Sequence, residues 1–278
     1  NAAATDIDGL SDSKSEGAEF TNSLLLGHQT TGILDAATYN TGVGLTALDA
    51  LTTGDWNIGI GEEALTANTT GAENTAIGAH ALDANTTANN NTLIGYNAGT
   101  AITTGDDNVA VGKDALAVST TGGRNTAVGS LALDANTTGD DNIAIGEESL
   151  TASTTGIKNV AIGNYALDAL TTGNQNAGIG YSALGGNTTG VNNNAIGYFA
   201  LNSNTTGDNN IAIGYEALKV NTTASDNTAI GTSALKANTT GTRNIAMGYG
   251  ALDAPDTESH NMAIGYDALG GSIAGGEY

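Results

Sequence analysis

A period of seventeen residues runs through almost the whole sequence and constrains the fold more than any other feature. Every seventeenth residue from Gly27 to Gly265 is glycine, fifteen in all, with no insertion or deletion. The residue before each glycine is aliphatic or Met, and Asn stands four residues before it in fourteen units. The consensus is Asn-x-Ala-Ile-Gly-x-x-Ala-Leu-x-x-Asn-Thr-Thr-Gly-x-x, and its first Asn is counted below as position one. Such a repeat predicts stacked units that form one elongated body.

The repeat also divides the chain. Its units cover residues 23–277, so we predict a repeat array over 23–278 and a non-repeat connector segment over 1–22. A Thr-Thr pair occupies positions thirteen and fourteen in twelve consecutive units. The sequence begins at Asn1 without a signal-peptide pattern, and we therefore expect a fragment or a processed product.

The pattern within each unit favours strands, because seventeen residues are too few for a pair of helices. Positions two and four carry many β-branched residues and share one strand face. Position three points to the other face and is Ala or Gly in thirteen of the fifteen units. We predict a second short strand at the Ala-Leu pair, with turns at the position-five glycine and at Asn-Thr-Thr-Gly.

These features predict an all-β fold, a parallel β-solenoid of fifteen coils. At about 4.8 Å per coil, the stack would be roughly 70 Å long. We expect ladders of Ile, Leu and Ala to fill its interior. Asn amides stacked at position one can bond to each other and to the turn backbone. In one typical coil the structural ladder residues are Asn210, Ile213, Gly214 and Leu218.

The predicted core is thin, because each coil offers one Ile, one Leu and two small residues. Burial of another face against copies of the same chain, most simply around a three-fold axis, would explain the small third position. A flat two-layer monomer could also use Ala there, for close approach of its sheets. Both interpretations stay open at this point.

The Asn-x-Ala-Ile-Gly unit, as at 159–163 and 227–231, resembles the head repeat of trimeric autotransporter adhesins. It is more similar to the NTAIGYxALxxNTTG arrays of phage tail-fibre-like proteins, over residues 23–278, and residues 5–15 resemble tail-fibre connectors. The first resemblance implies a left-handed, homotrimeric β-roll that binds host surface molecules. Tail fibres often end in a self-cleaving chaperone. None is visible here, which implies cleavage or truncation.

Composition bears on partners. The net charge is −22, with 7 Lys and Arg against 29 Asp and Glu, which opposes nucleic-acid binding and docking on anionic lipid. There is no Cys, and no apolar run approaches the length of a membrane span, so we predict no membrane insertion.

The acidic residues gather at a few repeat positions, and we expect them to form turns that are exposed to solvent. Ca²⁺ binding is the alternative at two sets: at positions sixteen and seventeen, Asp106, Asp107, Asp140, Asp141, Asp208 and Asp226; at position ten, Asp49, Asp83, Asp134, Asp168 and Asp253.

Nothing in the sequence predicts an enzyme, a metal site or a cofactor. The three histidines, His28, His80 and His260, occupy positions six, seven and seventeen, so no ladder joins them.

Tyrosine is more suggestive, because six of the nine occupy position six: Tyr96, Tyr181, Tyr198, Tyr215, Tyr249 and Tyr266. One interpretation is cross-coil stacking that stabilises the sheet. The other is a ligand-binding strip that grips glycan faces, made of Tyr181, Tyr198, Phe199, Tyr215, Tyr249 and Tyr266.

We therefore predict a structural and adhesive fibre segment, extracellular, on a virion tail or a bacterial surface, with a cell-surface glycan or protein receptor as partner. A filament without a specific ligand and an ice-binding solenoid that uses the Thr-Thr ladder are the alternatives. We expect the Thr-Thr pairs mainly to form turns. Sequons such as those at Asn68 and Asn187 recur with the repeat and carry little evidence of glycosylation.

Overall fold

The computed structural model describes residues 13–17, 20–26, 37–254 and 257–271. Most of the predicted connector segment, Gly27, His28 and residues 272–278 lie outside the described residues. The chain divides into two compact units, Asn1–Thr138 and Gly139–Tyr278. Within the described residues all regular structure is β-strand, and no helix there could cross a membrane.

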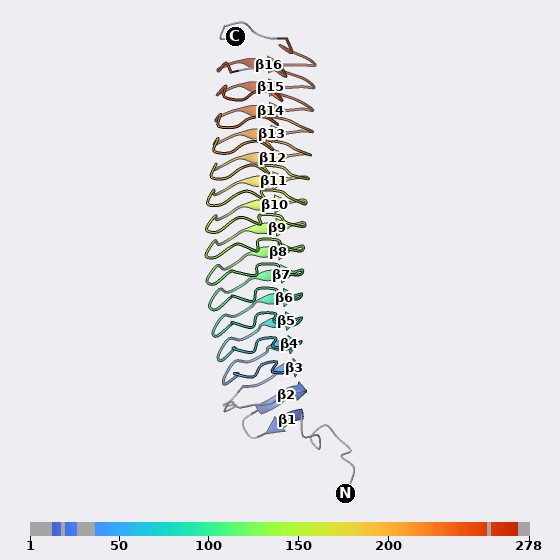
Figure 1. Cartoon of the computed structure of the whole chain (residues 1–278), viewed down its shortest axis with the longest axis vertical. Coiled ribbons are helices and arrows are strands. Elements are labelled where there is room, and N and C mark those ends of the chain that lie inside the picture. The colour runs from blue at the N-terminus through green and yellow to red at the C-terminus, as the bar shows by residue number, and fades with distance from the viewer. Residues whose placement is uncertain (1–12, 18–19, 27–36, 255–256, 272–278) are drawn as a thin grey trace. The chain divides into compact units, whose positions relative to one another are not determined.

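The first unit holds eight strands. β1 (Ser13–Gly17) pairs antiparallel with β2 (Phe20–Leu26), and β2 pairs in parallel with β3, with Leu24 opposite Thr41. The following strands pair in parallel in chain order (Figure 1). They are β3 (Thr41–Val43), β4 (Ile58–Ile60), β5 (Thr75–Ile77), β6 (Thr92–Ile94), β7 (Val109–Val111) and β8 (Thr126–Val128).

The second unit repeats the arrangement with eight parallel strands. Each strand lies beside the next one along the chain, with partners seventeen residues apart, as for Val160 and Ala177. They are β9 (Ile143–Ile145), β10 (Val160–Ile162), β11 (Ala177–Ile179), β12 (Asn194–Ile196), β13 (Ile211–Ile213), β14 (Thr228–Ile230), β15 (Ile245–Met247) and β16 (Met262–Ile264).

The predicted parallel β-solenoid is confirmed. The described residues make about thirteen coils of seventeen residues, slightly fewer than the fifteen predicted. Each coil contributes one three-residue strand, and the other fourteen residues run through turns whose backbone groups also bond between coils. For example, Leu48 N donates to Ala64 O at 3.0 Å and Ala50 N donates to Thr66 O at 3.0 Å.

One prediction about the interior is wrong: the position-four ladder does not fill it. Ile213 is 37% exposed on the outer face of the sheet, and its equivalents along both units lie on that face too. The interior takes position three instead, where Ala212 is fully buried. Ala217 and Leu218 complete it from positions eight and nine. The core is therefore one Leu and two Ala per coil.

The interior is too narrow for Ile because the turn opposite the strand packs directly against it. A Cβ added to Gly59, at position three, would lie 3.2 Å from Ala64 O and 3.3 Å from Leu48 Cγ. Little room remains beyond a methyl group, so the alternation of the strand places Ala inside and the larger position-four side chain outside.

The Ala-Leu pair does not form the predicted second strand. The leucine that follows Ala sits in the left-handed region, at φ +50° in Leu218 and +55° in Leu65. Position seven adopts the same conformation, at φ +55° in Glu216. Two left-handed residues separated by one other bend the chain, whereas a strand would keep it extended. Bulky L-residues rarely adopt this conformation, so local preferences argued against it.

The position-five glycine is required by both its conformation and its neighbours. Gly61 has φ +135°, a region open essentially to glycine alone, and a Cβ there would overlap the carbonyl group of Gly78 in the next coil. Any other residue would strain the backbone and separate the coils.

A buried ladder of asparagine amides fixes the spacing of the coils at position one. Asn210 donates from its backbone N–H and from Nδ2 to Asn193 Oδ1, at 3.0 and 3.1 Å, and from Nδ2 to Ala224 O at 2.9 Å. Its own Oδ1 accepts from Asn227 N at 3.0 Å. The side chain is fully buried, so its amide replaces the water that the turn backbone would otherwise need.

A second, interrupted ladder occupies position twelve. Asn204 Nδ2 donates to Asn187 Oδ1 and to Gly207 O, at 3.1 and 2.9 Å. Elsewhere this position holds Leu51 or Leu170, so it accepts an apolar side chain. Asn187, like Asn68, is fully buried, which places these glycosylation sequons out of reach of an enzyme in the folded chain.

One coil exchanges two core positions. Leu93 replaces the usual small residue at position three, and Gly99 replaces the usual leucine at position nine. A Cβ on Gly99 would overlap Leu93 Cδ2, so the leucine from the strand fills the volume that the turn leucine fills in other coils.

Replacement of the position-one amide should destabilise the fold far more than the same change at position twelve. We expect Asn210→Leu to lower the free energy of unfolding by about 3 kcal/mol or more, because several buried polar groups lose their partners. Asn204→Leu is the matched control and should lose less than about 1.5 kcal/mol. Denaturant titration measures both, and equal losses would contradict the distinct role of the first ladder.

Leu93 and Gly99 should behave as a coupled pair. Leu93→Ala opens a cavity and should cost about 2–5 kcal/mol, and Gly99→Leu alone should cost about 1–3 kcal/mol through overpacking. The double variant restores the common arrangement and should recover most of the loss. A double-mutant cycle on unfolding free energies tests this, and additive effects would refute the exchange.

Candidate ligand-binding surface and side-chain clusters

Three tyrosines at position six form a continuous stack in the second unit. The ring centroids of Tyr181 and Tyr198 lie 5.2 Å apart at 14°, and those of Tyr198 and Tyr215 lie 5.6 Å apart at 8°. Each tyrosine follows the glycine directly after a strand, so the parallel register of β11, β12 and β13 aligns the rings. They remain between 42% and 49% exposed. One edge of the coil stack thus presents a row of parallel aromatic rings to solvent.

Phe199 extends this row, and two residues that the sequence analysis did not select join it. Phe199 meets Tyr198 edge-on at 4.4 Å between centroids, and Lys219 Nζ lies 5.1 Å from the centroid of the Phe199 ring. Tyr165, from position seven, meets Tyr181 edge-on at 5.6 Å. Tyr165 could have been predicted from the sequence, because its position, seven, is next to position six, which holds most of the tyrosines.

The remaining tyrosines of the predicted strip stand apart from this stack. Tyr249 and Tyr266 stack on each other at 5.2 Å, but Thr232 occupies position six between Tyr215 and Tyr249. In the first unit Tyr39 and Trp56 stack at 4.1 Å through position seventeen, which sequence reasoning missed. The structure thus divides the predicted strip into a group of four and a pair.

An ion-pair cluster borders the aromatic stack. Glu216 accepts from Lys219 Nζ through Oε1 and from Lys236 Nζ through Oε2, each at 2.6 Å. These hydrogen bonds, first that from Lys219, lower the pKa of the Glu216 carboxyl, and Glu216 in turn raises the pKa of Lys236. The cluster joins position seven of one coil to position ten of the same coil and of the next.

The acidic groups singled out as a possible Ca²⁺ site have roles within the fold. Asp106 Oδ1 accepts from Asn89 N and Asp208 Oδ1 accepts from Val191 N, each at 2.7 Å and each from the preceding coil. Asp226 accepts from Asn209 Nδ2 at 3.2 Å. At position ten, burial raises the pKa of the Asp168 carboxyl. The position-sixteen carboxylates mainly bond to turn backbone between coils.

The two residues of the Thr-Thr pair differ in exposure. The first donates its hydroxyl to backbone of the next coil, as Thr52 Oγ1 does to Thr69 O at 2.8 Å. The second is exposed in all twelve pairs, from Thr53 to Thr240. Ice binding by these threonines would therefore depend on a single row of free hydroxyls.

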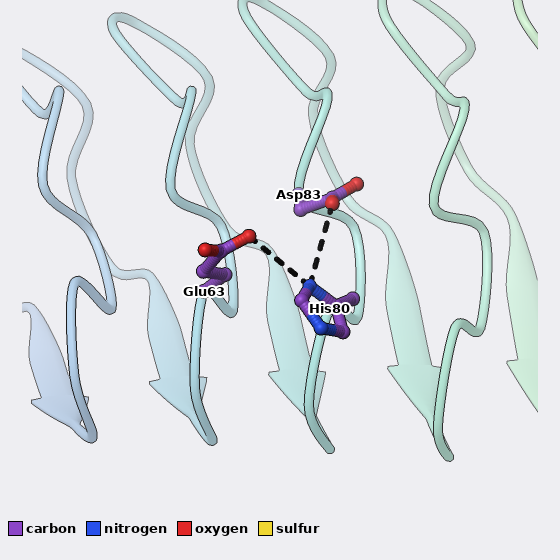
Figure 2. A group of neighbouring side chains, drawn as sticks. All are labelled: Glu63, His80 and Asp83. Carbon is purple, nitrogen blue, oxygen red and sulfur yellow. Dashed lines mark hydrogen bonds and ion pairs between the residues drawn. The ribbon is translucent and has the colours of Figure 1, made fainter.

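The structure brings one of the predicted lone histidines into a cluster. His80 Nδ1 lies 3.1 Å from Glu63 Oε2 and 3.9 Å from Asp83 Oδ2 (Figure 2). Glu63 and His80 share position seven of successive coils, and Asp83 lies at position ten, so a comparison of the histidines with each other did not predict the cluster. His260 Nε2 lies 3.3 Å from Arg243 Nη1, and His28 falls outside the described residues.

A further surface feature is the outer face of the parallel sheets, which we call the apolar face. It consists of positions two and four in strands β3 to β16, and no charged residue occurs at either position. Most of its large side chains are more than a third exposed, including Ile60, Ile94, Ile145, Ile162, Ile196, Ile213 and Met247. Position two also carries Thr in five of these strands and Asn194 in β12, so the face is continuously apolar only along position four. Exposed apolar surface that repeats over many coils marks an interaction surface on soluble proteins.

The chain matches no protein-family model and no curated protein.

Proposed function

We propose that this chain is a structural and adhesive fibre segment whose apolar face is buried against further copies of itself, most simply in a homotrimer. The observation that carries the proposal is the apolar face. It follows the coils of each unit and repeats an aliphatic side chain or Met at position four in every described coil.

A second copy of the chain is the occupant that fits this face best. Successive strands of a parallel sheet lie about 4.8 Å apart, so the aliphatic side chains form a regular ladder. A partner must offer complementary apolar groups at the same spacing over many coils, and another copy supplies them. The face carries no charge, so its burial desolvates no carboxylate despite a net charge of −22.

The adhesive part of the proposal rests on the aromatic stack of Tyr181, Tyr198, Phe199 and Tyr215. Parallel, half-exposed rings present flat apolar faces beside polar hydroxyls, which suits the ring faces of sugars in a cell-surface glycan. Identical strips on several copies would bind a dense surface multivalently, so weak individual contacts would suffice.

The proposal gives the chain a geometric role without a catalytic step. Stacked coils would project the binding strip away from a base, on a virion tail fibre or on a bacterial surface. The resemblance of the repeat to tail-fibre arrays and adhesin heads favours this extracellular setting.

Charge on the apolar face should dissociate the oligomer. We expect wild-type protein to sediment at three times the 27.5 kDa chain mass and the variant Ile162→Lys/Ile196→Lys to sediment as a monomer, because buried unpaired ammonium groups cost several kcal/mol. Thr172→Lys/Thr206→Lys adds the same charge on exposed turns and should remain trimeric. Analytical ultracentrifugation measures the mass, and circular dichroism checks folding. A wild-type monomer at micromolar concentration would refute the assembly.

Removal of the aromatic rings should weaken adhesion without loss of assembly. On a glycan array, we expect Tyr198→Ala/Tyr215→Ala to weaken binding at least tenfold, which corresponds to about 1.4 kcal/mol. Tyr39→Ala is the matched control, because Tyr39 and Tyr198 are both 44% exposed. No bound glycan for the wild type, or equal losses in both variants, would contradict the aromatic strip as the binding site.

A further inference from the structure

Glu63, His80 and Asp83 place three metal-ligating atoms together in the first unit. The ligand atoms, one from each side chain, all lie within 4.8 Å of one another, and all three residues are half-buried. In Figure 2 both carboxylates point toward the same imidazole nitrogen, Nδ1 of His80. One imidazole nitrogen and two carboxylate oxygens are a ligand set typical of transition-metal ions.

The solenoid holds these residues through backbone contacts between coils. Glu63 and His80 occupy position seven of successive coils, both in the left-handed conformation, at φ +58° and +57°. His80 N donates to Glu62 O at 2.8 Å, which fixes one turn against the other. Asp83 lies three residues further along the same turn as His80. The placement of the three side chains therefore follows from the coil register.

Neighbouring side chains orient two of the three ligands. Thr100 Oγ1 donates to Asp83 Oδ1 at 2.6 Å, which leaves Oδ2 as the oxygen directed toward His80. The ring of Tyr96 meets the imidazole edge-on at 6.0 Å between centroids and limits its rotation. Partners of this kind, which hold a ligand in place, are what metal sites require around their ligands.

Within the described residues, no Lys or Arg forms an ion pair with Glu63 or Asp83. The sequence between Lys14 and Lys113 contains eleven Asp and Glu and no Lys or Arg. The equivalent turns of the second unit show the contrast, since Lys219 and Lys236 there neutralise Glu216. The same pair of repeat positions thus carries a complete ion-pair cluster in one unit and a set of metal-ligand types in the other.

We propose that Glu63, His80 and Asp83 bind one divalent transition-metal ion of the Zn²⁺ class, with water in the remaining coordination positions. Bonds of about 2.0–2.1 Å around a tetrahedral ion separate its ligand atoms by roughly 3.4 Å. The separations from His80 Nδ1, 3.1 and 3.9 Å, lie on either side of that value, and the two carboxylate oxygens lie within 4.8 Å of each other, so the side chains must rotate to close around the ion. The imidazole ligand favours this class over Ca²⁺, which takes oxygen ligands.

The test is calorimetric titration of the untagged full chain with Zn²⁺ alone, followed by Co²⁺, whose absorption spectrum reports a nitrogen ligand and the coordination geometry. We expect one ion per chain at micromolar concentration. His80→Gln should weaken binding at least about 100-fold and remove the Co²⁺ spectrum. Glu62→Gln removes an adjacent carboxylate outside the cluster, and His260→Gln removes a histidine in the other unit. Both controls should leave binding unchanged.

Three outcomes would overturn the proposal. The first is the absence of saturable Zn²⁺ binding below millimolar concentration. The second is equal affinity of wild type and His80→Gln, which would show binding at scattered carboxylates. The third is equal competition by Ca²⁺ at the same concentration. Circular dichroism of each variant establishes that the coils remain folded, so a loss of affinity reports the site itself.

Discussion

The hydrogen bond from one coil to the Asn Oδ1 of the coil before it is the interaction on which the described units depend. For example, Asn210 donates its backbone N–H to Oδ1 of Asn193, which lies seventeen residues earlier in the chain and has a buried side chain. A slip by one residue would remove the acceptor and turn the Ala face of the strand outward. The leucine ladder, the glycine contacts and the tyrosine stack all require that register. The narrow core acts in the same direction, because it has no room for the larger position-four side chain that such a slip would turn inward.

The period of seventeen residues made the parallel register predictable. It did not predict which side chains of each strand face the interior. Gly44 and Gly61 are seventeen residues apart, and only stacked coils explain fourteen such steps in succession. Position three is mostly Ala and position four is aliphatic or Met, however, so alternation alone does not decide between Ala212 and Ile213. The decision depends on room inside the coil, which depends in turn on Leu218 in a left-handed turn. Local preferences disfavour that conformation, and only the contacts of the whole coil stabilise it.

Side-chain clusters that depend only on the period could be predicted from the sequence, whereas those that depend on the turn conformation could not. Tyr181, Tyr198 and Tyr215 share position six, so the register alone brings them together. Phe199 meets Lys219, and His80 meets Asp83, across positions seven and ten. Those contacts follow from turn geometry and not from the period. To predict a contact between positions seven and ten, one must know that the turn between them is left-handed. The pattern of apolar residues does not reveal that conformation.

The distribution of charge links the fold to assembly. Every Asp, Glu, Lys and Arg of the described coils lies outside the three-residue strands. Copies could therefore meet at the apolar face without desolvating a carboxylate, while the acidic turns stay in water, where salt screens their repulsion over about 8 Å. The repulsion still grows with each added copy. Basic side chains offset it around Glu216, and a divalent ion at Glu63, His80 and Asp83 would do so where the sequence supplies none. A coil with a small core can carry many acidic residues because these residues and the proposed contact face occupy different repeat positions.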